Sequence, residues 1–187
     1  LLLPAVFNVQ RNVRVAQVRA DIAQLEAGIA AFRAKFPIDP PSSLVLYEDP
    51  SDAAGGAWST STNTRDANSR ELLRSLWPRF NFANTALRDL NGDGDTSDTI
   101  ELTGGECLTF FLGGMLDRSG SDVTRWAPIG FSSNPVNPFS TTDLTNRVGP
   151  FFEFRIDRFS DVDADGMPEY RDPIPGQTNP YQYASSY

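Results

Sequence analysis

Apolar residues recur near the start of the chain at alternating spacings of three and four. The series is Val15, Val18, Ile22, Leu25, Ile29, Phe32 and Phe36. A period of about 3.5 residues places all of them on one face of a helix, and the charged residues lie off that face. No proline occurs between Pro4 and Pro37. The pattern therefore predicts one long amphipathic helix, which we expect to pack on the chain's own sheet; a dedicated coiled coil is the alternative.

Ahead of this pattern lies an unbroken apolar run, made of Leu1, Leu2, Leu3, Pro4, Ala5, Val6 and Phe7. Seven consecutive apolar residues cover every side of a helix, so contact with the chain's own body cannot bury them all. They need a bilayer or copies of the same helix. Because a membrane span takes about 20 apolar residues, we expect the run to be the end of a longer segment that starts upstream. It lacks the charged start and cleavage site of a complete secretory signal.

The helical segment, residues 1–36, is expected to precede a globular head, residues 37–187. Asn68 or Ser69 is expected to cap a short helix over residues 71–77. A third helix is expected over residues 105–112, with the following glycines as its stop. The stretch from 51 to 68 is rich in Gly, Ser, Thr and Asn, which is typical of a long surface loop.

Strand signals are weaker. The apolar run at residues 44–47 is expected to enter the core. Alternation at residues 151–157, with Phe152 and Phe154 on one face, predicts a half-buried antiparallel strand, and residues 181–183 form a second candidate. Together the elements indicate an α+β fold, in which the long helix packs on a small antiparallel sheet with long loops.

Composition narrows the possible functions. The chain has 24 acidic and 16 basic residues, a formal charge of −8 that repels phosphate backbones, so we expect no nucleic-acid partner. It has no histidine, the commonest general base. The single cysteine, Cys107, lies in an apolar stretch and is expected to be buried. Three tryptophans, Trp58, Trp77 and Trp126, suggest sugar stacking, but isolated tryptophans more often belong to packing. We therefore expect no enzyme.

The sharpest chemical signal is an acidic loop. Carboxylates at Asp161, Asp163, Asp165, Glu169 and Asp172 occupy positions one, three, five, nine and twelve, and Gly166 occupies position six. Alternate side chains of a tightly curled loop point inward, so the first three carboxylates can converge on one cation. The glycine permits the sharp turn, and the carbonyl of Met167 is a further candidate ligand. The spacing predicts a calcium site; an open, solvated acidic loop is the alternative.

A second acidic cluster has the same opening. It consists of Asp89, Asn91, Asp93, Asp95 and Asp98, but its twelfth position is Ile100. Two interpretations stay open. Either the loop closes around a cation with Asp95 and Asp98, or it is a polar turn without metal.

The first loop resembles the aspartate-rich calcium repeats of thrombospondin type 3 and related bacterial proteins, over twelve residues. Extracellular calcium modules have dissociation constants of roughly 10⁻⁴ to 10⁻³ M. One such site adds about 1.4 kcal/mol of stability when free calcium is about tenfold above that constant. Because cytosolic calcium is low, the prediction favours an extracytoplasmic location. Chelation should lower the melting temperature.

Both ends of the chain resemble one protein family. The run from Leu1 to Val6 resembles the end of the hydrophobic N-terminal helix of bacterial type IV pilin-like proteins. The segment Gln24 to Pro37 resembles the exit of that helix, where an aromatic and a basic residue precede a proline turn. Asn179-Pro180-Tyr181-Gln182-Tyr183 resembles the Asn-Pro-Tyr-x-Tyr strand of major pseudopilins. The chain is most similar to a type II secretion pseudopilin; residues 51–146 carry no motif of the family.

The resemblance implies a pilin-like fold, insertion into the inner membrane before assembly by a secretion or pilus machinery, and polymerisation into a helical filament. The filament interface would include the apolar run and Val9. Arg11, Arg14 and Arg19 lie close to it, although basic residues beside a membrane segment tend to mark its cytoplasmic side. Either a basic leader upstream outweighs them, or they pair with acidic residues of adjacent subunits.

The leading hypothesis is a structural subunit of an extracytoplasmic pilin-like filament or type II secretion pseudopilus, with calcium-stabilised loops. The alternative is a membrane-tethered, calcium-dependent binding or adhesion module that does not polymerise. A surface hydrolase would need two acids of separated proton affinity facing a cleft, whereas the acids here have a metal-like spacing.

Overall fold

The computed structural model describes residues 3–49, 58, 64–82, 88–118, 126–142 and 144–186, with side chains from residue 9 onward. Leu1 and Leu2 of the predicted filament interface lie outside this part, as do the side chains of the interface residues Leu3 to Phe7 and most of the predicted surface loop. In chain order the elements are α1 (Leu3–Lys35), β1 (Leu44–Tyr47), α2 (Thr64–Leu76), β2 (Thr99–Leu102), α3 (Gly104–Gly113), β3 (Met115–Asp117), β4 (Ala127–Ser132), β5 (Arg147–Val148), the 3₁₀ turn η2 (Ile156–Arg158), β6 (Phe159–Ser160) and β7 (Glu169–Tyr170).

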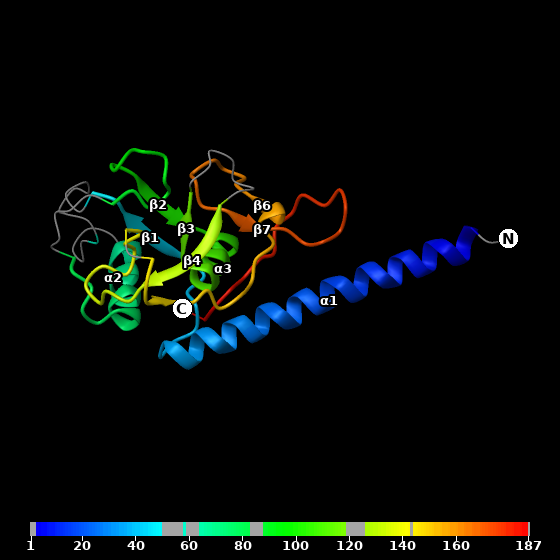
Figure 1. Cartoon of the computed structure of the whole chain (residues 1–187), viewed down its shortest axis with the longest axis horizontal. Helices are drawn as coiled ribbons and strands as arrows, with labels where there is room; N and C mark the ends of the chain where they lie inside the picture. The colour runs from blue at the N-terminus through cyan, green and yellow to red at the C-terminus, as the bar shows by residue number, and fades with distance from the viewer. Residues whose placement is uncertain are drawn as a thin grey trace.

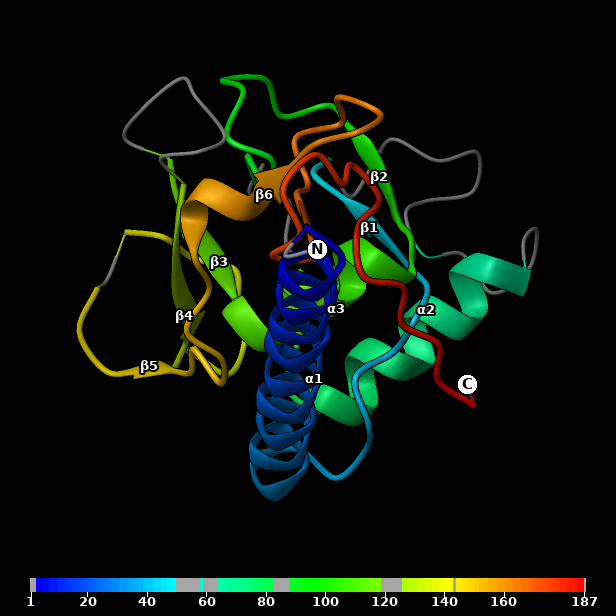
Figure 2. The ribbon, with the colours of Figure 1, turned by 90° about the vertical axis from the view of Figure 1, so that its right-hand side faces the viewer.

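The strands form three small antiparallel sheets, β1-β2, β3-β4-β5 and β6-β7. Figure 2 looks along α1, with β3, β4 and β5 on one side, β1, β2 and α2 on the other, and α3 between them. Helix α3 is buried from Gly105 to Gly113 because apolar residues predominate around it; its polar residues Glu106 and Thr109 are buried with them. The predicted α+β class and long N-terminal helix are confirmed.

Helix α1 is about 50 Å long at 1.5 Å per residue and extends far beyond the head (Figure 1). Its C-terminal part packs on α3. The Phe32 ring lies 5.7 Å from that of Phe111, and Leu25 and Phe36 are also buried. The main partner of the predicted apolar face is thus a helix rather than a sheet, because α3 separates α1 from the strands.

The head covers only the C-terminal part of the apolar face of α1. On this face Val15 and Ile22 are 41% and 42% exposed; Val9 and Val13, farther out and on the opposite side of the helix, are 61% and 51% exposed. The prediction that the whole stripe from Val15 packs on the chain's own body is therefore wrong for its first part, since the head ends before that part of the helix.

A polar junction holds α1 near the last point of contact. The Asp21 carboxylate lies 2.6 Å from the Arg158 guanidinium, and both side chains are mostly buried. The Tyr181 hydroxyl also donates to Asp21, at 3.3 Å, and the Tyr183 hydroxyl donates to the Pro40 carbonyl, at 2.8 Å. The segment 181–183 is therefore not the strand expected from its sequence. Its tyrosines instead fasten the helix and its exit to the head.

The predicted strand at 151–157 is also wrong. Phe152 and Phe154 are buried as the alternation requires, but the segment is irregular and ends in η2, where Ile156 is exposed. Its backbone packs on α1 instead of on another strand. A Cβ at Gly28 would lie 3.2 Å from the Phe151 carbonyl oxygen, and the Phe151 N–H donates to the Leu112 carbonyl at the end of α3.

Helix α3 matches its prediction, and Gly114 caps its C-terminus with φ 77°. Helix α2, however, starts at Thr64, so Asn68 and Ser69 lie inside it. Ser69 is not a cap; its buried hydroxyl accepts a hydrogen bond from the Val45 N–H of β1. The last residues of the predicted loop, 64–68, are therefore helical.

The core is rich in aromatic rings, including those of Trp58 and Trp77, which are 1% and 8% exposed. Their burial argues against a sugar-stacking surface at these two positions. Cys107 is fully buried, as predicted. No helix in the described part of the chain combines the length and the apolar character needed to cross a bilayer.

Candidate metal centre

Three carboxylates from two distant parts of the chain meet near the first turn of α3. Ligand oxygens of Glu106, Asp163 and Asp165 all lie within 4.8 Å of one another. Glu106 belongs to α3, and the two aspartates belong to the predicted calcium loop between β6 and β7. Within the described ranges this is the one group of three or more acidic, histidine or cysteine side chains so placed.

The loop is curled by its own side chains. The Gly166 N–H donates to Asp161 Oδ2 at 3.1 Å, and the Met167 N–H donates to Asp165 Oδ1 at 2.8 Å. Ala164 and Gly166 have φ values of 62° and 84°, so the chain makes the left-handed turns that a tight loop requires. The loop thus has the curled form that its spacing predicts.

Glu106 is held by the helix start. As the third residue of α3, it accepts a hydrogen bond from the Thr103 N–H through Oε2, at 2.5 Å, as part of a capping box. The side chain is 1% exposed. Its other oxygen, Oε1, is buried and has no hydrogen-bond partner among the described residues, and no described cation pairs with it. Asp161 Oδ1 is buried and unpartnered in the same sense.

These carboxyls resist ionisation. Burial raises the pKa of Asp165 to about 7, and the charges of Glu106, Asp163 and Asp161 contribute to this rise. Burial likewise raises the pKa values of Glu106, Asp161 and Glu169, each with a further rise from the Asp163 carboxylate. Ionising these carboxyls together would place several negative charges close to one another, which a cation would offset; the Arg118 guanidinium already offsets part of the rise in the pKa of Asp161.

The remaining predicted ligands of the first loop lie at its edge. Glu169 is buried beside the cluster, and its Oε2 accepts from the Val162 N–H at 3.3 Å, which closes the base of the loop. The Met167 side chain points into the core. Asp172, at position twelve, instead caps the Ile174 N–H at 2.8 Å and lines a separate pocket with Arg155 and Arg171. The structure thus brings Glu106, rather than Asp172, to Asp163 and Asp165.

The second loop is organised differently. Each of its acidic or amide side chains accepts a hydrogen bond from within the loop. Asp89 accepts from the backbone N–H groups of Gly92 and Gly94. Asn91, Asp93 and Asp95 each accept from the backbone N–H two residues later, and Asp98 accepts from the Asn91 side-chain amide. Buried Glu48 holds the loop's base, because it accepts from the backbone N–H groups of Leu90, Asn91 and Asp98. These side-chain caps curl the second loop, as the caps of Asp161 and Asp165 curl the first.

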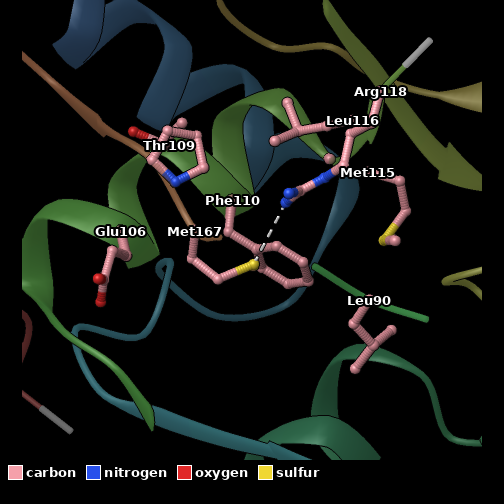
Figure 3. A pocket seen from close by; sticks show the side chains of 10 residues that line it. Leu90, Glu106, Thr109, Phe110, Met115, Leu116, Arg118 and Met167 are labelled. Carbon is pink, nitrogen blue, oxygen red and sulfur yellow. Dashed lines mark hydrogen bonds between the residues drawn. The ribbon is translucent and has the colours of Figure 1, made fainter. Parts of the chain in front are cut away.

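The two loops touch. The Asn91 amide donates to the Asp165 carbonyl at 3.1 Å, and Arg118 donates to the Gly166 carbonyl. Burial lowers the pKa of Arg118 to about 10, which leaves it cationic at neutral pH. In Figure 3 its guanidinium approaches the Met167 sulfur from the side opposite to the Glu106 carboxylate. Arg118 therefore contacts the loop at Gly166, on the side away from Glu106, and does not pair with Glu106.

The sequence pattern did not predict that Glu106, Glu48 and Arg118 belong to this region. For Glu106 a signal was present, since Thr103-Gly-Gly-Glu106 has the spacing of a capping box. That signal marks a helix start, not a ligand. No local pattern marks Glu48 or Arg118, because each acts on residues more than 40 positions away.

The arrangement can hold a hard divalent cation, because all its donors are oxygens and several are charged. It offers no histidine or thiol ligand: the chain lacks histidine, and burial raises the pKa of the Cys107 thiol far above its usual range. Comparisons with protein-family models, with curated protein sequences and with solved structures gave no match.

Proposed function

We propose that this protein is a structural subunit of an extracytoplasmic pilin-like filament or type II secretion pseudopilus, which assembles through α1. The observation that carries the proposal is the projecting part of α1, whose apolar side chains Val9, Val13 and Ile22 are 61%, 51% and 42% exposed. Exposed apolar residues of this density on one helix are a common mark of an interaction site.

The placement of these side chains favours a bundle over a single partner surface. Val9 and Val18 are nine residues apart, which is two and a half turns at 3.6 residues per turn, so they face opposite sides of the helix. Val13 lies on the side of Val9, and Ile22 lies on the side of Val18. A helix with apolar residues on opposite sides is buried best among several neighbours, as in a filament core.

Charge supports contact between copies. Residues 1–36 hold five basic and two acidic side chains, a net charge of +3, so the head carries −11. Arg11, Arg14 and Arg19 are exposed on the projecting part. In an assembly these arginines would meet the acidic heads of adjacent subunits, which favours association of unlike ends of the molecule.

The further parts of the proposal follow from the family resemblance. They are a pilin-like fold, insertion into the inner membrane before assembly, contact with the assembly machinery, a place in the cell envelope and a non-catalytic role. Calcium is the proposed ion of the head, where it would stabilise the acidic loop. Nucleic acid is not a proposed partner, because the head is strongly acidic.

The proposal predicts concentration-dependent assembly of the full chain, which sedimentation velocity and negative-stain microscopy would detect. The double variant V9D/V13D should stay monomeric, because charged side chains cannot be buried among apolar helices. The matched control Q10D/Q17D adds the same charge at polar positions and should assemble like the parent chain.

Two results would contradict the proposal: a parent chain that stays monomeric at every concentration, or V9D/V13D filaments equal to those of the parent. A monomer with an ordered α1 would instead favour the tethered binding module. Unchanged melting of the head in V9D/V13D would show that the substitutions act on assembly and not on folding.

A further inference from the structure

The strongest unexplained feature of the head is the buried carboxylate of Glu106. A carboxylate that is 1% exposed and has one oxygen without a described partner is costly, because burial of a charge requires pairing or hydrogen bonds. Its first oxygen is used by the Thr103 N–H. The second is free on the same side chain that lies within 4.8 Å of Asp163 and Asp165.

A second orphan lies on the loop itself. Asp161 binds the Gly166 N–H through Oδ2, whereas its Oδ1 is buried without a described partner. Asp161, Asp163 and Asp165 are positions one, three and five of the loop, the positions whose side chains converge in calcium loops. Arg118 offsets part of the charge of Asp161 and Asp165, but Glu106 Oε1 and Asp161 Oδ1 are buried without a described partner. These two oxygens therefore indicate a place for a further cation.

We propose that Glu106 is a ligand of one calcium ion, which it shares with Asp161, Asp163 and Asp165, so that the ion ties the acidic loop to the first turn of α3. Glu106 takes the part that a carboxylate at position twelve plays in a regular calcium loop. Asp172 does not take this part, because it caps Ile174 in a different pocket.

Calcium fits this site better than a softer or smaller ion. All donors are oxygens, which suits calcium and magnesium, and no thiol or imidazole is present. Calcium accepts six to eight oxygens in irregular geometry, whereas magnesium requires a near-ideal octahedron and keeps its waters. The carboxylates of one helix and a curled loop supply part of such an irregular shell, and water completes it.

The site links the acidic loop to the first turn of α3. Helix α3 supports both α1 and the strands, so an ion at its first turn fixes the loop relative to the element on which α1 packs. The second loop stays outside the site. Its Asn91 binds the Asp165 carbonyl and so supports the first loop from behind.

The test is calcium titration of the full chain by isothermal calorimetry after removal of metal with a chelator. We expect one ion per chain and a rise in melting temperature. E106Q keeps the size of the side chain and should weaken binding by at least about tenfold, because it removes a charged ligand. D93N, in the second loop, is the matched control and should bind like the parent.

Glutamine at position 106 could disturb the start of α3, so D163N provides a second variant. Asp163 is exposed. Its substitution should weaken calcium binding without lowering the melting temperature of the metal-free protein. The proposal would be overturned if the parent bound no calcium, or if E106Q and D163N bound calcium as tightly as the parent does. Equal loss of affinity in D93N would overturn the assignment to the first loop.

This inference deepens the calcium part of the proposed function, but the two can fail separately. Calcium titration is therefore repeated on V9D/V13D. If that variant binds one ion and does not assemble, both proposals stand. If the parent assembles but binds no calcium, the metal site fails alone; if it binds calcium but never assembles, the filament proposal fails alone.

Discussion

At the residue scale, the head is unusual in the number of carboxylates that it buries. Glu106, Glu169 and Glu48 are all less than 9% exposed. Glu48 is satisfied by three backbone N–H groups, so it has a structural role at the base of the second loop. Glu106 lacks such compensation at one oxygen, and this contrast separates a structural carboxylate from a candidate ligand.

The buried acids predict how stability depends on pH when calcium is absent. The pKa of Asp165 is raised from 3.8 to about 7 in the folded protein, so between these values the folded state binds a proton that the unfolded state releases. The contribution of Asp165 to stability should therefore be fully present below about pH 4 and should be lost as the pH rises to about 7. In excess chelator, the melting temperature should be several degrees lower at pH 7.5 than at about pH 5.

The control for this pH dependence is D165N, which cannot titrate at that position. Its melting temperature should fall less steeply over the same range, although the other buried acids shift in the same direction. A parent protein that becomes more stable from pH 5 to 7.5 in chelator would contradict the raised pKa values of the buried acids. In saturating calcium the dependence should be reversed, because the ion binds the deprotonated carboxylates.

At the element scale, α1 is joined to the head by two kinds of contact. Apolar contacts run from Leu25 to Phe36, and the polar junction at Asp21 lies farther out. Arg158 is fixed at this junction by Asp21, by the Arg171 carbonyl, and by the Tyr170 ring at 4.1 Å. The junction sets where the helix leaves the head and so how much of it projects.

The substitution D21N tests this junction. It removes the charge that balances the mostly buried Arg158 guanidinium, so unfolding free energy should fall by about 2 kcal/mol. E26Q is the matched control on the same helix, where the side chain is exposed, and it should change stability by less than about 0.5 kcal/mol. Urea denaturation measures both; equal stabilities of D21N and E26Q would contradict the role of the junction.

The elements differ in how well the sequence predicts them. The period of α1 and the glycines after α3 report local structure, so both helices were predicted close to their bounds. The alternation at 151–157 was misleading, because an irregular segment that packs Phe152 and Phe154 produces the same pattern as a strand. Helix α2 begins seven residues before its predicted start. The sequence did not reveal its first turns because they are polar, and polar turns give no apolar period.

The candidate site was predictable only in part, because a sequence pattern reports local structure and not tertiary packing. The one-three-five spacing of Asp161, Asp163 and Asp165 is local, and the loop has the curled form that it predicts. Glu106 comes from an element more than 50 residues earlier, so its place beside the loop depends on tertiary packing. The second loop has almost the same opening, but its base is held by Glu48, which no local pattern marks.

At the scale of the whole molecule, a basic, partly apolar rod is joined to an acidic head. The exposed valines and arginines of α1 lie on the rod, and the candidate calcium site lies in the head. In the proposed function, the rod would mediate assembly and the ion would order the acidic loop. Loss of calcium should therefore lower the stability of the head and leave the apolar contacts between rods in place.

In the proposed filament, the exposed apolar side chains of α1, among them Val13, become buried among copies of the chain. A thiol at position 13 reports this burial directly, because the native Cys107 is fully buried and will not compete for an alkylating reagent. V13C is compared with L144C, which places a thiol at an exposed apolar position of the head, 63% exposed in the structure.

The measurement is the rate of maleimide alkylation as the protein concentration rises from the monomeric to the assembled range. We expect the alkylation rate of V13C to fall by about tenfold or more on assembly, since a buried thiol is protected, and to recover in detergent. The rate for L144C should change little. A V13C rate that is independent of concentration, or that changes no more than that of L144C, would contradict the proposed burial of α1.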